Sequence, residues 1–351
     1  MRIGGWSLAA LGMSVNAACA NFRPPPPQVA PEAAGAAPAE VWVVKAGRGI
    51  TDPLVVSGPI ALLAGTDRVL RAISVDDASE RWSRRLPGAA VGGVALRDSV
   101  LYLATHRPQG RIVAVNAASG VRLWETSSGE ATTGVGSAGG LVGVVNNKGY
   151  LVALDERTGR QRWARRVGLS RVTPAGIGDA FVIATQDSLL RVETTAGRTT
   201  HRRQSPGAVL DGWVPVGGHL VASTGDSLVV AIDPMSLATA WSARVDSPVM
   251  GDLAVRGDTI WAVTRIGSLY RMVEGRPERL ASLGAPVTTG VVLVGDLLVF
   301  GAADGLLRAL TADGREAWRV GLSWNITVDP VPLSDGFIAL GGDGDLHRFR
   351  P

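Results

Sequence analysis

The residue types that most often carry catalysis or bind metals are few in this chain and lie far apart. The four histidines, His106, His201, His219 and His347, show neither HxH nor HxxxH spacing, whereas a zinc site needs several ligands close together. Cys19 is the only cysteine, which excludes a CxxCH haem motif and an internal disulfide. A GxSxG nucleophile sequence is absent. We therefore expect no catalytic residue, no metal site and no cofactor.

Cys19 lies at the end of a segment with the layout of an export signal. Arg2 precedes an apolar stretch from residue 3 to 15, and small residues surround the cysteine. The sequence NAAC is similar to a bacterial lipobox, in which the cysteine is lipidated; alternatively, Ala18-Cys19-Ala20 fits ordinary signal peptidase cleavage. We predict a signal peptide over residues 1–20, and a Pro/Ala-rich linker over residues 21–40 that would serve as a spacer from a lipid anchor.

An internal repeat predicts the fold of the remaining chain, residues 41–351. The clearest unit, GYLVALDERTGRQRW, ends at Trp163 and reads as a strand, a turn and a second strand. Related units end at His201 and Arg279, which stand where tryptophan is expected. The period is near 40 residues, the length of a four-stranded propeller blade. The tryptophans at the repeat position, which we expect to pack between blades, are Trp42, Trp82, Trp124, Trp163, Trp241 and Trp318.

The two ends of the chain complete the predicted architecture. A Gly/Ala-rich strand and a more apolar strand precede each repeat unit, as in residues 92–98 and 99–105. The last unit supplies three strands, and the segment from residue 41 supplies only a Trp-bearing strand. Joining them closes the ring and removes an exposed edge. The sequence thus predicts an all-β, eight-bladed β-propeller whose last blade is closed by the N-terminal strand.

Other recurrent polar residues have a structural interpretation within this fold. Aspartates precede second strands, where they favour turns: Asp98, Asp179, Asp258, Asp296 and Asp335. We interpret GGDGDLH, with Asp343 and Asp345, as a hairpin turn of the last blade. Arginines recur in third strands, where ion pairs along the strand face are the favoured interpretation and a positive funnel for an acidic partner is the alternative: Arg71, Arg191, Arg271, Arg308 and Arg348.

Composition narrows the class of protein. The 351 residues are 46% hydrophobic and 19% charged, which is typical of a globular chain. Beyond the N-terminal stretch, the sequence contains no apolar run long enough for a membrane-spanning helix. The formal net charge is +4, but the arginines are spread over the repeats without a basic tail. We therefore expect no nucleic-acid partner.

The unit G-x-L-x-A-L-D-x-x-T-G-x-x-x-W resembles the pyrroloquinoline-quinone (PQQ) type propeller repeat over residues 41–351. This family has an enzymatic branch and a non-enzymatic branch of BamB-like lipoproteins of the outer-membrane barrel-assembly machinery. The enzymatic branch implies adjacent paired cysteines and long inserted loops, which this chain lacks. Chain size, export signal and terminal closure resemble the non-enzymatic branch. This chain differs from that branch in the partner-binding loop, which is long, acidic and apolar in the family, whereas the corresponding segment 164–176 is short and basic.

The resemblance implies a non-catalytic scaffold that is anchored to the outer membrane, faces the periplasm and binds envelope proteins, with outer-membrane protein assembly as the leading role. Three alternatives stay open: a soluble periplasmic or secreted location, a propeller that binds a small ligand or acts as a quinoprotein-type enzyme, and an accessory subunit of another envelope complex. Trp213 and Trp324 fall in or near strand connections. They are therefore our candidate partner contacts.

Overall fold

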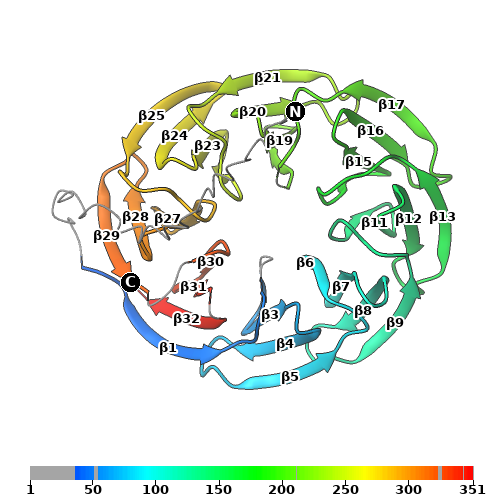
Figure 1. Ribbon diagram of the computed structural model, residues 1–351, viewed down its shortest axis with the longest axis horizontal. Coiled ribbons are helices and arrows are strands. Elements are labelled where there is room, and N and C mark those ends of the chain that lie inside the picture. Colours follow the sequence, from blue (N-terminus) through cyan, green and yellow to red (C-terminus); the bar gives the residue numbers. More distant parts are fainter. Residues whose placement is uncertain (1–35, 51–53, 211, 323–325, 343, 351) are drawn as a thin grey trace, which may run out of the picture. The chain divides into compact units, whose positions relative to one another are not determined.

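Thirty-two short strands, and no helix, make up the part of the chain that the computed structural model describes, residues 36–50, 54–210, 212–322, 326–342 and 344–350. They form eight antiparallel sheets of four strands each, arranged as blades around a ring (Figure 1). The prediction of an all-β, eight-bladed propeller is confirmed. Within these residues, no helix could cross a membrane.

Blades 1 to 4 follow one another along the chain. Blade 1 contains β2 (Val55–Ser57), β3 (Ile60–Ala64), β4 (Val69–Ser74) and β5 (Glu80–Arg85). Blade 2 contains β6 (Ala90–Arg97), β7 (Val100–Thr105), β8 (Arg111–Asn116) and β9 (Arg122–Ser127). Blade 3 contains β10 (Gly136–Ala138), β11 (Leu141–Val145), β12 (Tyr150–Asp155) and β13 (Gln161–Arg166). Blade 4 contains β14 (Ala175–Ile177), β15 (Ala180–Ala184), β16 (Ser188–Glu193) and β17 (Thr199–Gln204).

Blades 5 to 8 complete the ring. Blade 5 contains β18 (Val214–Val216), β19 (His219–Ser223), β20 (Leu228–Ile232) and β21 (Thr239–Arg244). Blade 6 contains β22 (Ala254–Arg256), β23 (Thr259–Val263), β24 (Ser268–Val273) and β25 (Arg276–Ser282). Blade 7 contains β26 (Val292–Val294), β27 (Leu297–Gly301), β28 (Leu306–Thr311) and β29 (Glu316–Gly321). Blade 8 contains β30 (Val331–Leu333), β31 (Gly336–Leu340), β32 (Asp345–Arg350) and β1 (Ala39–Lys45).

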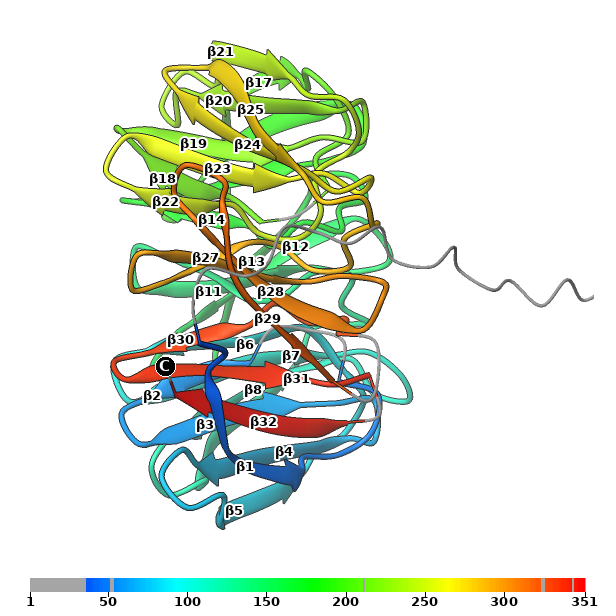
Figure 2. The ribbon, with the colours of Figure 1, turned by 90° about the vertical axis from the view of Figure 1, so that its left-hand side faces the viewer.

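The N-terminal strand closes blade 8, as the sequence predicts. β1 pairs antiparallel with β32, with Lys45 opposite Asp345 and Trp42 opposite Arg348. The two strands lie side by side in both views (Figures 1 and 2). β1 begins at Ala39, so it includes the last two residues of the segment that we expected to be linker.

The hydrophobic core is divided among the gaps between blades. Eight buried clusters occur, and each one joins two neighbouring blades around the ring. The second and third strands supply most of these side chains, as in β15, where all five residues are buried. A single blade buries little apolar surface alone, so its stability depends on its neighbours.

Candidate functional site

Four of the repeated tryptophans donate a hydrogen bond from their blade to the next one. The indole Nε1 of Trp82 donates to the carbonyl of Ala117 at 3.1 Å, and that of Trp163 donates to Thr194 at 2.7 Å. Each carbonyl lies in the turn between the third and fourth strands of the following blade. Buried indole N–H groups usually find such a partner. The same bond is made by Trp42 and Trp124.

The turn residues of the repeat explain why the indole fits there. In blade 3, Asp155 accepts hydrogen bonds from the backbone N–H and the hydroxyl of Thr158, which lower the pKa of the Asp155 carboxyl. Gly159 follows with φ +68°, and a Cβ atom there would lie 2.5 Å from the Trp124 ring. The D-x-x-T-G sequence thus shapes a turn that lies directly against the indole of the preceding blade.

Two blades, 4 and 6, have another residue at this position. In blade 4, His201 lies opposite Arg191, whose buried guanidinium pairs with Asp179 at 3.1 Å. In blade 6, the bulge comes two residues earlier along the third strand than in blades 5 and 7, so Arg279 pairs with Tyr270. Arg279 lies three residues before Ser282, as Trp241 lies three residues before Arg244, so it keeps the spacing of the repeat tryptophan but lies opposite a different residue of the third strand.

Blade 6 uses another tryptophan to reach its neighbour, which our sequence analysis missed. Trp261, on β23, donates its Nε1 to the carbonyl of Ala312 in blade 7 at 3.3 Å. This carbonyl corresponds to those that accept the repeat indoles. The only available signal was a tryptophan in a second strand of a blade that lacks the repeat tryptophan.

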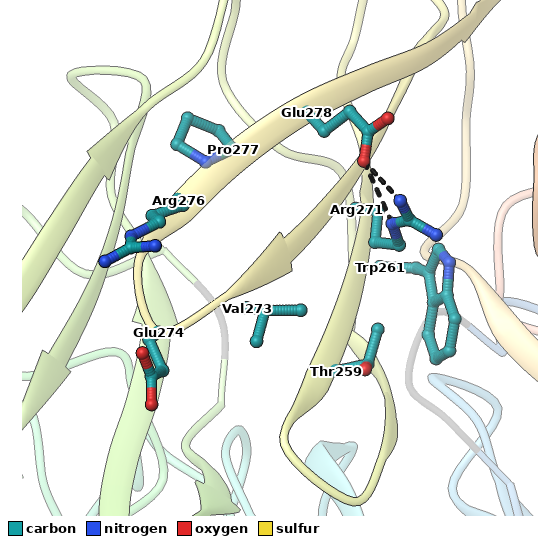
Figure 3. A pocket seen from close by; sticks show the side chains of 8 residues that line it. All are labelled: Thr259, Trp261, Arg271, Val273, Glu274, Arg276, Pro277 and Glu278. Atoms are coloured by element: carbon teal, nitrogen blue, oxygen red, sulfur yellow. Dashed lines mark hydrogen bonds and ion pairs between the residues drawn. The ribbon is translucent and has the colours of Figure 1, made fainter.

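A depression of about 400 Å³ on blade 6 is lined in part by Trp261. Figure 3 shows two of its lining residues, Arg271 and Glu278, paired with each other beside Trp261. Its other charged residues are Glu274 and Arg276, so acidic and basic groups are balanced. A nucleophile, base and oxyanion donor would have to converge for hydrolytic chemistry, and these residues supply no such set.

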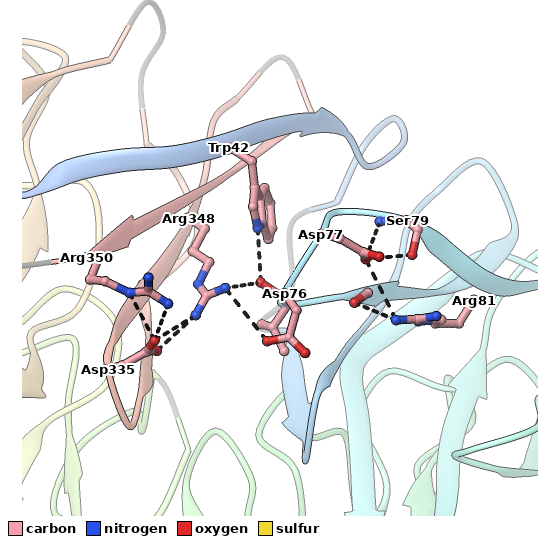
Figure 4. A network of polar contacts seen from close by, with 10 residues as sticks. Trp42, Asp76, Asp77, Ser79, Arg81, Asp335, Arg348 and Arg350 are labelled. Atoms are coloured by element: carbon pink, nitrogen blue, oxygen red, sulfur yellow. Dashed lines mark hydrogen bonds and ion pairs between the residues drawn. The ribbon is translucent and has the colours of Figure 1, made fainter.

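The ring closes through an arginine network (Figure 4). Arg348 is buried, and its guanidinium donates to both carboxylate oxygens of Asp335, at 3.0 and 2.9 Å, and to the carbonyl of Val75 in blade 1. Trp42 donates to the same carbonyl. Arg350 also pairs with Asp335, and the hydrogen bonds from Arg350 and Arg348 lower the pKa of the Asp335 carboxyl. The network joins the last blade to the first and lines a depression of about 360 Å³.

Two carboxyls meet where the innermost strands of blades 6 to 8 begin. Asp329 accepts hydrogen bonds from the backbone N–H groups of Gly290, at 2.6 Å, and Asp252, at 2.9 Å. Limited hydration raises the pKa of Asp329 to about 6 and also raises that of Asp252. Water still reaches Asp252, which is exposed, so its ionisation costs less than in a closed core. No third acidic or histidine ligand joins them within the described residues.

One face of the ring carries exposed apolar side chains on consecutive blades. We call it the loop face, because it contains the connections between blades and the turns between the second and third strands of each blade. These connections and turns are hydrogen-bonded to each other, for example from Asn147 N to Glu130 O. Leu169, in the connection from blade 3 to blade 4, is 63% exposed. An exposed apolar side chain held on a short connection is a candidate contact for a protein partner. Three others lie on this face in blades 3 to 6: Tyr150, Leu210 and Ile266.

The residues singled out in the sequence are not gathered into one site. Trp213 lies one residue before β18 and is partly buried against the cluster between blades 4 and 5, with its Nε1 unpartnered among the described residues. Trp324, Cys19 and Asp343 lie outside the described residues. The histidines occupy four different blades. All five third-strand arginines form ion pairs with carboxylates.

Comparisons with known proteins agree with the repeat and the fold. A protein-family model described as outer membrane protein assembly factor BamB matches residues 108–215. The BamB of Yersinia pestis is 23% identical over 252 residues, and this match spans 63% of each chain.

Solved structures match over most of the ring. The crystal structure of BamB from Moraxella catarrhalis has a TM-score of 0.74 at 17% identity, covering 90% of this chain and all of that one. A computationally designed protein, Ika8, has a TM-score of 0.73 at 13% identity, covering 89% of this chain and 99% of its own. The chain is thus an eight-bladed β-propeller with PQQ-like repeats that is similar to the outer membrane protein assembly factor BamB.

Proposed function

We propose that this chain is a non-catalytic protein-binding scaffold of the bacterial envelope that assists outer-membrane protein assembly. The observation that carries the proposal is the presence of four exposed apolar residues on the loop face of blades 3 to 6. Three of them, Tyr150, Leu169 and Leu210, fall within residues 108–215, the segment that matches the BamB family model. Apolar side chains held on short, hydrogen-bonded connections lose little entropy when a partner covers them. Arg171, exposed beside Leu169, would pair with an acidic group of that partner.

The rival function, binding or oxidising a small ligand, has less support. A ligand site needs convergent polar groups in a largely apolar pocket. The depression on blade 6 has balanced charges, and no arginine of the described residues hydrogen-bonds to the carboxyls of Asp252 and Asp329. An accessory role in another envelope complex would use the same loop face with a different partner.

The location that we propose is the periplasmic side of the outer membrane, with Cys19 lipidated. Labelling cells with a radioactive fatty acid tests this part separately. Incorporation into the wild-type protein and its loss in Cys19→Ala is expected. A wild-type protein that remains unlabelled and soluble after cell fractionation would contradict the anchor, while leaving the binding role intact.

Affinity purification from detergent-solubilised envelope tests the binding role. We expect the tagged chain to recover the barrel-assembly complex, and Leu169→Glu to reduce this recovery about tenfold, because a buried carboxylate at an apolar contact is strongly unfavourable. Met235→Glu is the matched control: Met235 is 55% exposed, but lies in a turn between third and fourth strands, on the opposite face. Recovery of a different complex, or equal loss in both variants, would refute the proposal.

A further inference from the structure

The outermost strand of each blade leaves one backbone edge unpaired within the described sheets. Free N–H and C=O groups on such an edge can pair with a strand of another protein, and charged side chains or proline usually prevent it. Most blades carry such protection beside the repeat tryptophan position. The protecting residues in β5, β9, β13, β17, β25 and β29 are Arg81, Glu125, Arg162, Arg202, Glu278 and Arg319.

β1 lacks this protection. The residues on either side of Trp42 are Val41 and Val43, which are 41% and 50% exposed. Its charged residues lie only toward its ends: Glu40, which contacts His347, and Lys45, which pairs with Asp345. In the remaining blade, 5, the corresponding residues of β21 are the small Ala240 and Ser242, which favour strands less than valine.

The geometry of β1 suits the addition of a strand. Trp42 and Val44 pack into the cluster between blades 8 and 1, so Val43, between them, faces the other way. Pairing with β32 is regular over residues 42–45, beyond the irregularity at Val41. β1 lies on the rim of the ring, with its outer edge uncovered by any other described strand (Figures 1 and 2).

We propose that residues 42–45 of β1 bind an extended segment of another protein as a fifth strand of blade 8. The backbone edge accepts only an extended chain, and Val43 favours an apolar or β-branched side chain opposite it. The fitting partner is a segment in which apolar residues alternate with polar ones, the pattern of strands in outer-membrane barrels. This identification of the partner class rests on the proposed function, whereas strand addition itself does not.

A peptide-binding experiment with the purified chain tests the proposal. The probe is a fluorescent peptide of alternating valine and threonine, about ten residues long, compared with one in which proline replaces each central valine. We expect only the first peptide to bind and to slow amide hydrogen exchange in residues 42–45. Val43→Arg, which gives β1 the residue type that β17 carries beside His201, should weaken binding about tenfold or more.

Ser242→Arg is the matched control, because it adds the same charge at the corresponding position of β21. It should leave the affinity unchanged. Equal weakening by both variants would show a general electrostatic effect and overturn the proposal. Undiminished binding by Val43→Arg, protection of another strand, binding of the proline peptide, or pairing of β1 with a second copy instead of the peptide would also overturn it. Because this assay contains no other envelope protein, its result is independent of whether the loop face binds the assembly complex.

Discussion

Replacing Gly159 by alanine tests whether blade-to-blade packing at the repeat turn stabilises the ring. Gly159 has φ +68°, and an added Cβ would lie 2.5 Å from the Trp124 ring. The left-handed conformation costs alanine about 1–2 kcal/mol. Overpacking a tight contact adds about 1–3 kcal/mol. We therefore expect Gly159→Ala to lower the free energy of unfolding by about 2–5 kcal/mol.

Gly178→Ala separates these two costs. Gly178 also has a positive φ, +57°, but its added Cβ would meet no atom within 4 Å. It should lose only the backbone contribution, about 1–2 kcal/mol. Any gain from restricting the unfolded chain applies to both variants.

Urea unfolding followed by tryptophan fluorescence measures both variants under identical conditions. We expect Gly159→Ala to be less stable than Gly178→Ala by about 1–3 kcal/mol. We also expect this difference to shrink when Trp124 is replaced by leucine, because the two sites are coupled. Equal losses in the two alanine variants, or an excess that persists without Trp124, would refute the packing explanation.

Three further predictions concern the same ring. Trp163→Phe should lower the free energy of unfolding by about 1–3 kcal/mol, measured by urea unfolding, because it keeps much of the packing but leaves the Thr194 carbonyl without its indole donor. The folded state raises the pKa of Asp329 from 3.8 to about 6, so protonated Asp329 contributes its full stabilisation below pH 4, and this stabilisation is lost as the pH rises through 6. Thermal melts between pH 4 and 7 should therefore show the wild type losing at most about 3 kcal/mol of stability relative to Asp329→Asn. Arg348→Met should lower the unfolding free energy by about 2 kcal/mol and speed hydrogen exchange in β1 and β32, because it removes the bond from blade 8 to the Val75 carbonyl of blade 1 and the bonds to Asp335 within blade 8; unchanged exchange in these strands would contradict a closing role.

The sequence alone determined the architecture, because the repeat encodes each blade locally. The D-x-x-T-G turn, the apolar second and third strands and the terminal Trp unit predicted eight blades and their closure, and the structure has both. In Asp155 and Thr158, for example, the hydrogen bonds join residues three apart in the chain, so the residue types suffice to predict the turn.

The functional surfaces depended on relations that sequence spacing does not contain. Gly290 and Asp329 meet although 39 residues separate them, and Trp261 takes over a bond that the repeat assigns to another position. The earlier bulge in blade 6 changed which residue lies opposite Arg271. Exposure of Leu169 and Val43 follows from which neighbouring blade covers each position. Local hydrogen bonds and turn preferences act over a few residues and are readable along the chain, whereas packing between blades is decided only when the ring closes.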